Sequence, residues 1–200
     1  MAGFGLEHLV VAPISAEANN SITYGTGAVA EHARRAAITY NWDEGRLNGD
    51  NKLAEYRRRL NDADIELETT ELPGEMAVTM GLEKVKTAAT TGTGATPAVY
   101  TLKTNSNVSL GVGYVCWDVI NNEDVYTAVL VHKVTLTRNN EERTTKEDTV
   151  NWKCPTVSGK AWPVDLDASG EDQIRDYAEF TGSGARAAAI AWIDGKLNVS

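Results

Sequence analysis

Apolar and polar residues alternate over three successive segments in the first half of the chain. The segments are residues 36–43, 53–60 and 63–68. A period of two is typical of half-exposed strands, because successive side chains of a strand point to opposite faces. Polar turns at residues 45–51 and at Asn61-Asp62 separate the segments. The pattern predicts an antiparallel meander with one apolar face and one densely charged face.

A short helix is predicted directly after the meander, because the spacing of apolar residues changes there. Leu72, Met76 and Met80 are four residues apart and therefore share one side of a helix. Pro73 suits the first turn of a helix, and Gly81 suits the left-handed position just past its end. The helix should lay an apolar stripe on the sheet.

The second half of the chain begins with a predicted hairpin of residues 108–119 and 125–136 over a turn at 121–124. The second of these strands is almost continuously apolar, which is typical of a strand covered on both faces. Residues 6–14 fit a first short strand or an extended arm. Further strands are expected at 99–103 and 149–157, loops at 15–27 and 87–97, a highly charged turn at 138–148, and a helix at 171–180. Residues 28–35 fit either a helical turn or the lead into a strand, and the Ala-rich residues 185–193 fit either a helix or a strand. The chain is therefore predicted to be mainly β and antiparallel.

The composition favours one packed domain that does not bind duplex nucleic acid. The chain has 200 residues, 42% of them apolar, and a net charge of -9. This charge disfavours binding to phosphate and to an anionic membrane surface. The start of the chain lacks a basic n-region, and no apolar run approaches the ~20 residues of a spanning helix, so we expect no signal peptide and no membrane contact. Cys116 and Cys154 are expected to be reduced, buried thiols.

The motifs predict neither a catalytic site, a cofactor nor a metal. Two Gly-x-Gly fragments, at 92–94 and 111–113, do not complete a dinucleotide fingerprint. His8, His32 and His132 lack the spacing of metal ligands. A Cys–His nucleophile pair stays open as an alternative, because such partners need to be close only in space.

Residues 165–176 partly match a calcium-binding loop. Asp165, Asp167, Ser169 and Gly170 fit its first six positions, but Asp176 replaces the bidentate Glu at position twelve. The alternative, which we favour, is a helix start capped by Ser169.

A second candidate site is the acidic set Asp64, Glu66 and Glu68, whose members point to the same side of a strand about 6.6 Å apart. Such carboxylates can serve general acid–base chemistry, but no sugar cleft accompanies them. We favour a solvated strand face.

Soft patterns in a characteristic order resemble the major tail tube proteins of long-tailed, non-contractile bacteriophages. They are the start at residues 4–14, Thr23-Tyr24-Gly25, the strand end at 47–51, the run at 60–68 and the short helix ending at Gly81. The resemblance covers most of the chain and weakens from about Ser158.

The resemblance implies an antiparallel β-sandwich or partly open barrel with one short flanking helix and extended loops. A C-terminal helix is a possible further element of this fold. It divides the chain into a tail-tube domain at 1–158, with an N-terminal arm at 1–30, and a C-terminal extension at 159–200 packed on the same domain. The implied function is structural: six copies form a ring, and stacked rings form a hollow virion tube through which DNA reaches the host.

The implied partners are other copies of the chain, a tape-measure protein in the lumen, and tail terminator and distal tail or baseplate proteins at the tube ends. The subunit would be made in the host cytoplasm, and double-stranded DNA would pass through the tube transiently. An acidic inner face would repel phosphate and let the DNA slide.

The resemblance also suggests roles for three sets of residues in the meander. The candidate lumen-facing acidic residues are Glu55, Asp64, Glu66 and Glu68. The candidate inter-ring stacking loop contains Gly45, Arg46, Asn48, Gly49, Asp50 and Asn51. The candidate intersubunit residues are Arg57, Arg58 and Arg59.

Two other classes of function remain open. One is a related tube or baseplate component, such as a tail terminator, a hub or a secretion-type tube protein. The other is a small β-rich module that binds carbohydrate or calcium. Its candidate carbohydrate platforms are Trp117, Trp152, Trp162 and Trp192.

Overall fold

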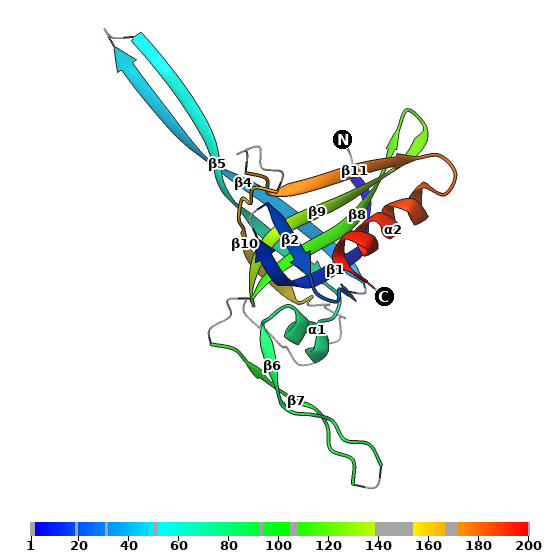
Figure 1. Cartoon of the computed structure of the whole chain (residues 1–200). Helices are drawn as coiled ribbons and strands as arrows, with labels where there is room; N and C mark the ends of the chain where they lie inside the picture. The colour runs from blue at the N-terminus through cyan, green and yellow to red at the C-terminus, as the bar shows by residue number, and fades with distance from the viewer. Residues whose placement is uncertain are drawn as a thin grey trace, which may run out of the picture.

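The computed structural model describes residues 3–18, 20–30, 32–49, 52–92, 94–104, 108–138, 154–166 and 172–199. These parts of the chain form a mainly β fold of antiparallel strands with two helices, as the sequence predicts (Figure 1). The fold is sandwich-like, and its main sheet does not close into a barrel. No helix among the described residues is long and apolar enough to cross a membrane.

Nine strands form the main sheet, and a separate two-stranded ribbon projects from its lower end in Figure 1. Along the sheet the strands follow the order β2 (Ser21–Tyr24), β1 (Gly3–Ala18), β8 (Ser109–Ile120), β9 (Glu123–Arg138), β10 (Thr156–Ala161), β5 (Lys52–Thr69) and β4 (Ala33–Gly49). Off this path, β3 (Ala28–Ala30) pairs with β1, and β11 (Arg175–Thr181) pairs with β9. The projecting ribbon consists of β6 (Glu83–Thr87) and β7 (Val99–Leu102).

The predicted hairpin of the second half is confirmed as β8 and β9, and β9 is covered on both faces. One apolar cluster, which includes Val129 and Val131, fills the space inside the curled sheet. A second cluster, which includes Ala128 and Leu130, lies on the other face of β9 under α2 (Ala185–Leu197). The near-continuous apolar run of β9 therefore reflects two cores.

The short helix is confirmed as α1 (Gly74–Thr79), which follows Pro73 and ends before Gly81 at a positive φ of 73°. Met76 and Met80 are buried in the core inside the sheet. Gly74 lies against the ring of Tyr100, where a Cβ would come within 2.4 Å. The stripe of apolar residues thus closes one end of the curled sheet.

The predicted turn at Asn61-Asp62 is wrong, because β5 continues through it. Asn41 pairs with Asp62 and Trp42 pairs with Leu60, so Asn61 is an extra residue in a β-bulge. The three predicted strands are therefore two long ones. Residues 42–49 of β4 and 52–60 of β5 extend beyond the body as a twisted ribbon, here called the distal ribbon (Figure 1).

The helix predicted at 171–180 is also wrong. Residues 175–181 form β11, in which half-buried and exposed side chains alternate and every residue pairs with β9. Pairing with the open edge of a long buried strand outweighs local helix signals, because propensity is decided by context. Ser169, the predicted cap, lies outside the described residues.

Three smaller expectations are also settled. The predicted loop at 15–27 is wrong in part, because β1 continues to Ala18 and residues 21–24 form β2. The ambiguous residues 28–35 contain β3 and the start of β4, and residues 185–193 are helical.

Two predictions are not settled. Most of the predicted strand at 149–157 and of the predicted turn at 138–148 lies outside the described residues. The domain division stays a prediction, and β10 spans its boundary at residue 158.

Candidate functional site: the charged face of β4, β5 and β10

The bulge at Asn61 places all four candidate lumen residues on one face of the sheet. Before the bulge, Glu55 lies opposite Leu47, an odd-numbered position of β4. After it, Asp64 and Glu66 lie opposite Thr39 and Ala37, which are also odd-numbered. Directly opposed residues share a face, and one extra residue shifts the parity of a strand by one. We call the charged face the side of β4, β5 and β10 that carries Arg35, Asn41, Glu55, Arg57, Arg59, Asp62, Asp64, Glu66, Glu68, Ser158 and Lys160.

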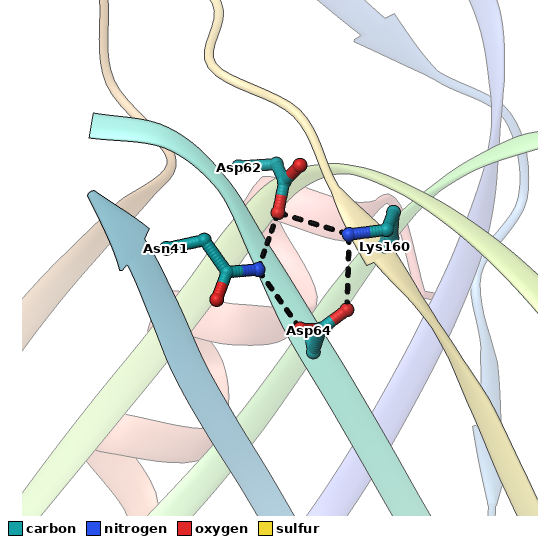
Figure 2. Close-up of polar contacts among 4 residues, drawn as sticks. All are labelled: Asn41, Asp62, Asp64 and Lys160. Carbon is teal, nitrogen blue, oxygen red and sulfur yellow. Dashed lines mark hydrogen bonds and ion pairs between the residues drawn. The ribbon is translucent and has the colours of Figure 1, made fainter. Parts of the chain in front are cut away.

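Four polar side chains in the middle of this face form a closed ring of contacts (Figure 2). The Asn41 amide donates to Asp62 Oδ1 at 2.6 Å and to Asp64 Oδ2 at 2.8 Å. The Lys160 ammonium donates to Asp62 Oδ1 at 3.0 Å and lies 3.1 Å from Asp64 Oδ1. These contacts join the three strands across their pairing, because each strand supplies at least one member.

Hydrogen bonding keeps both carboxylates of this ring ionised. The hydrogen bond from Asn41, followed by that from Lys160, holds the pKa of Asp62 and Asp64 below their ordinary value. The same contacts with Asp62 and Asp64 raise the pKa of Lys160. A general acid at neutral pH needs a raised carboxyl pKa, so this arrangement suits a fixed charged surface better than proton transfer.

Cations pair with the remaining carboxylates along β5. Arg35 lies 3.1 Å from Glu66, and Arg34 lies 3.1 Å from Glu68. The lining of this part of the face, which includes Thr137 and Ser158, forms an open groove of about 620 Å³. The face is therefore hollowed and highly charged, with its positive groups held next to its negative ones.

The three candidate intersubunit arginines have acidic neighbours within the same chain. Arg57 Nε lies 2.6 Å from Glu55, and Arg59 lies 2.8 Å from Asp172. Arg58 is on the opposite face of the ribbon, over the ring of Trp42 at 4.3 Å. Their role between subunits stays a prediction, and any such contact would compete with these partners.

The candidate stacking residues lie toward the tip of the distal ribbon. Gly45 and Arg46 are in β4, as are the backbones of Asn48 and Gly49. Asp50 and Asn51 lie outside the described residues. The stacking role stays a prediction that the position of the ribbon suits.

The other candidate chemistry does not gather into a site among the described residues. No described contact joins either cysteine to a histidine; the Cys154 thiol accepts from Arg34 at 2.8 Å, and burial raises the pKa of Cys116. Part of the calcium-loop match, 167–171, lies outside the described residues. Within the described ranges there is no group of three His, Cys, Asp or Glu that could hold a metal.

The candidate carbohydrate platforms are on separate elements. Trp117 is in β8, Trp162 follows β10 and Trp192 is in α2. Trp152 lies outside the described residues. This arrangement adds nothing to a sugar-binding interpretation.

Sequence reasoning missed Asn41, Asp62 and Lys160 as members of the site. The sequence predicts a turn at Asp62, and Lys160 is 98 residues away from it along the chain. The local signal for Asp62 is the alternation of acidic and apolar residues that starts there and continues through Asp64 and Glu66. No local pattern identifies Lys160, because the pairing of β10 with β5 brings it there.

We predict that the ring of contacts makes the fold sensitive to acid. Because the pKa of Asp62 and Asp64 is lowered in the folded state, their stabilising contribution is complete above the unfolded value of about 3.9. It is lost as the pH falls through the lower folded-state value. Urea midpoints at pH 7 and pH 3 should therefore differ less for the double variant Asp62→Asn, Asp64→Asn than for the wild type. Equal differences would contradict the role of the ring.

Comparison with models of known protein families finds no match, and comparison with curated proteins finds none either.

Proposed function

We propose that this chain is the structural subunit of a hollow tube of the bacteriophage-tail type. Six copies form a ring, rings stack, and the DNA genome passes through the central channel. The tube would hold a tape-measure protein and end at terminator and distal tail proteins. On this proposal the chain has no catalytic role.

The observation that carries the proposal is the charged face itself, on an open sheet. Glu55, Asp64, Glu66 and Glu68 share one face because the bulge at Asn61 lies between Glu55 and the other three. The strand β4 is at the end of the main sheet, with no further strand beyond it among the described residues. A 17-residue strand with one unpaired edge is an aggregation hazard for a monomer, and assembly into a closed ring would cover that edge.

The pairing of cations on this face suits a surface along which DNA slides. Affinity for DNA comes largely from Lys and Arg contacts to phosphate. Here Lys160 is held by two aspartates, and Arg35 and Arg57 are each held by a glutamate. Phosphate would have to displace a carboxylate to reach any of them, so binding to the wall is weakened.

Reversing two of these charges should slow the release of DNA without preventing assembly. In Glu66→Lys, Glu68→Lys, Arg34 and Arg35 lose their carboxylate partners and the wall gains two lysines, so phosphates would be retained. We expect tubes of normal length and ejection slowed severalfold in assembled virions, measured by dye-accessible DNA. Glu123→Lys, Glu179→Lys makes the same charge change away from the charged face and should eject normally. Normal ejection by the first variant would count against the lumen assignment.

The proposal as a whole is tested by the assembly state of the purified chain. Size-exclusion chromatography and negative-stain microscopy over a range of concentrations should show rings or hollow tubes. A monomer that persists at high concentration would argue against the proposal.

A further inference from the structure

The two faces of the distal ribbon differ in chemistry, and the second face is built like a binding surface. Cross-strand pairing places Trp42 opposite Leu60, Glu44 opposite Arg58 and Arg46 opposite Tyr56. We call the aromatic face the set Trp42, Glu44, Arg46, Tyr56 and Arg58. Trp, Tyr and Arg are the residue types that dominate binding energy in protein interfaces.

The aromatic face is exposed and already ordered. Trp42 is 44% exposed and Tyr56 is 45% exposed. Arg58 lies over the Trp42 ring at 4.3 Å, and Arg46 lies over the Tyr56 ring at 5.8 Å. Glu44 lies 3.4 Å from Arg46 and 3.9 Å from Arg58, and so holds the two cations in place. A partner would therefore meet large side chains that lose little freedom on binding.

A groove beside α1 offers a complementary surface. It lies near the other end of β5, after Thr69. It has a volume of about 370 Å³ and is lined by Val29, Pro73 and Met76 together with Glu71 and Glu75. Both glutamates are exposed, and neither has an ion-pair partner in the described part of the chain. The groove thus combines an apolar lining with two available negative charges.

One copy cannot join these two surfaces. Tyr56 and Thr69 are thirteen positions apart on the extended strand β5, which corresponds to roughly 40 Å. Figure 1 shows the distal ribbon leaving the body at the upper left and α1 at the lower side of the body. A contact between them must connect different copies and uses a different surface on each. Such a contact repeats from copy to copy into a ring if its rotation closes and into an open stack if it does not.

We propose that the aromatic face of one copy docks in the α1 groove of the next copy, where Arg46 and Arg58 meet Glu71 and Glu75. This assignment rests on the proposed self-assembly and names the contact that stacks the copies. The charges are complementary, and the aromatic rings supply the apolar area that the groove can bury.

Charge reversal and its repair test the pairing. Arg58→Glu and Glu75→Arg should each raise the critical concentration for stacking, measured by sedimentation and negative-stain microscopy, by about tenfold or more. Both changes in one chain should restore it to within about threefold of the wild type. Lys196→Glu makes the same charge change as Arg58→Glu on α2 and should have no effect. Single variants that stack like the wild type, or a double variant without repair, would overturn the assignment.

A cross-link locates the contact directly. The cross-link is made in a chain with Cys116→Ser and Cys154→Ser, because both native thiols are free. Chains that also carry Tyr56→Cys, mixed with chains that also carry Thr79→Cys in the groove lining, should form a disulfide-linked pair under mild oxidation, and neither alone should. Stacks without that cross-link would overturn this contact while leaving the tube proposal in place. A wild-type chain that never associates would overturn both.

Discussion

The substitution Gly159→Ala is expected to destabilise the fold by about 3 kcal/mol or more. Gly159 is in β10, between Leu136 of β9 and Ile65 of β5. A Cβ at this position would lie 2.1 Å from the carbonyl oxygen of Thr135, and backbone in a paired strand has little room to shift. The added methyl group therefore has to push β10 away from β9, which weakens the middle of the main sheet.

The same Gly-to-Ala change in α2 provides the control. A Cβ at Gly195 meets no atom within 4 Å. Alanine has a higher helix propensity than glycine, so Gly195→Ala should stabilise the protein by about 0.5–1 kcal/mol. Urea unfolding of both variants measures the two shifts. A small effect at Gly159 would mean that β9 and β10 do not approach as closely as described.

The second large effect is expected for Ile193→Ala, at about 3 kcal/mol of destabilisation. Ile193 is fully buried in the cluster under α2 and lies over Gly113, where a Cβ would come within 2.8 Å of its Cγ2. The glycine leaves a hollow in β8 that the isoleucine fills. Truncation empties that hollow, and the sheet beneath is too well paired to collapse into it.

Leu102→Ala is the matched control, because Leu102 is 57% exposed on the β6–β7 ribbon. It should change the free energy of unfolding by no more than about 0.5 kcal/mol. If Ile193→Ala had as little effect, α2 would be a loosely attached appendage. A loss of about 3 kcal/mol in the free energy of unfolding is expected if α2 unfolds together with the rest of the chain.

Some elements could be read directly from the sequence because their signals are local. The alternation in residues 36–43 and 63–68, the apolar run of β9, and the Pro73 and Gly81 that bracket α1 are each contained in one short segment. Period and end signals are properties of the backbone geometry of a single strand or helix, and they do not depend on which other element lies nearby. The mainly β, antiparallel character followed from them.

Other elements depended on partners far away in the chain. The stretch that became β11 carries helix signals, but the edge of β9 was available to pair with it. Lys160 joins Asp62 and Asp64 only because β10 lies beside β5. The composition of one segment does not show which strand edge another segment offers for pairing, or which charged side chain another segment brings close.

The sequence by itself determined that residues 36–68 carry one apolar and one charged set of side chains. Only the tertiary structure decided how these sets join across Asn61. Because side chains on a strand repeat every two residues, one extra residue exchanges the two faces of everything beyond it. The bulge keeps Glu55 on the side of Asp64 and Glu66 and leaves Trp42, Tyr56 and Arg58 together on the other. A bulge depends on how two strands pair, and the sequence of neither strand alone specifies that pairing.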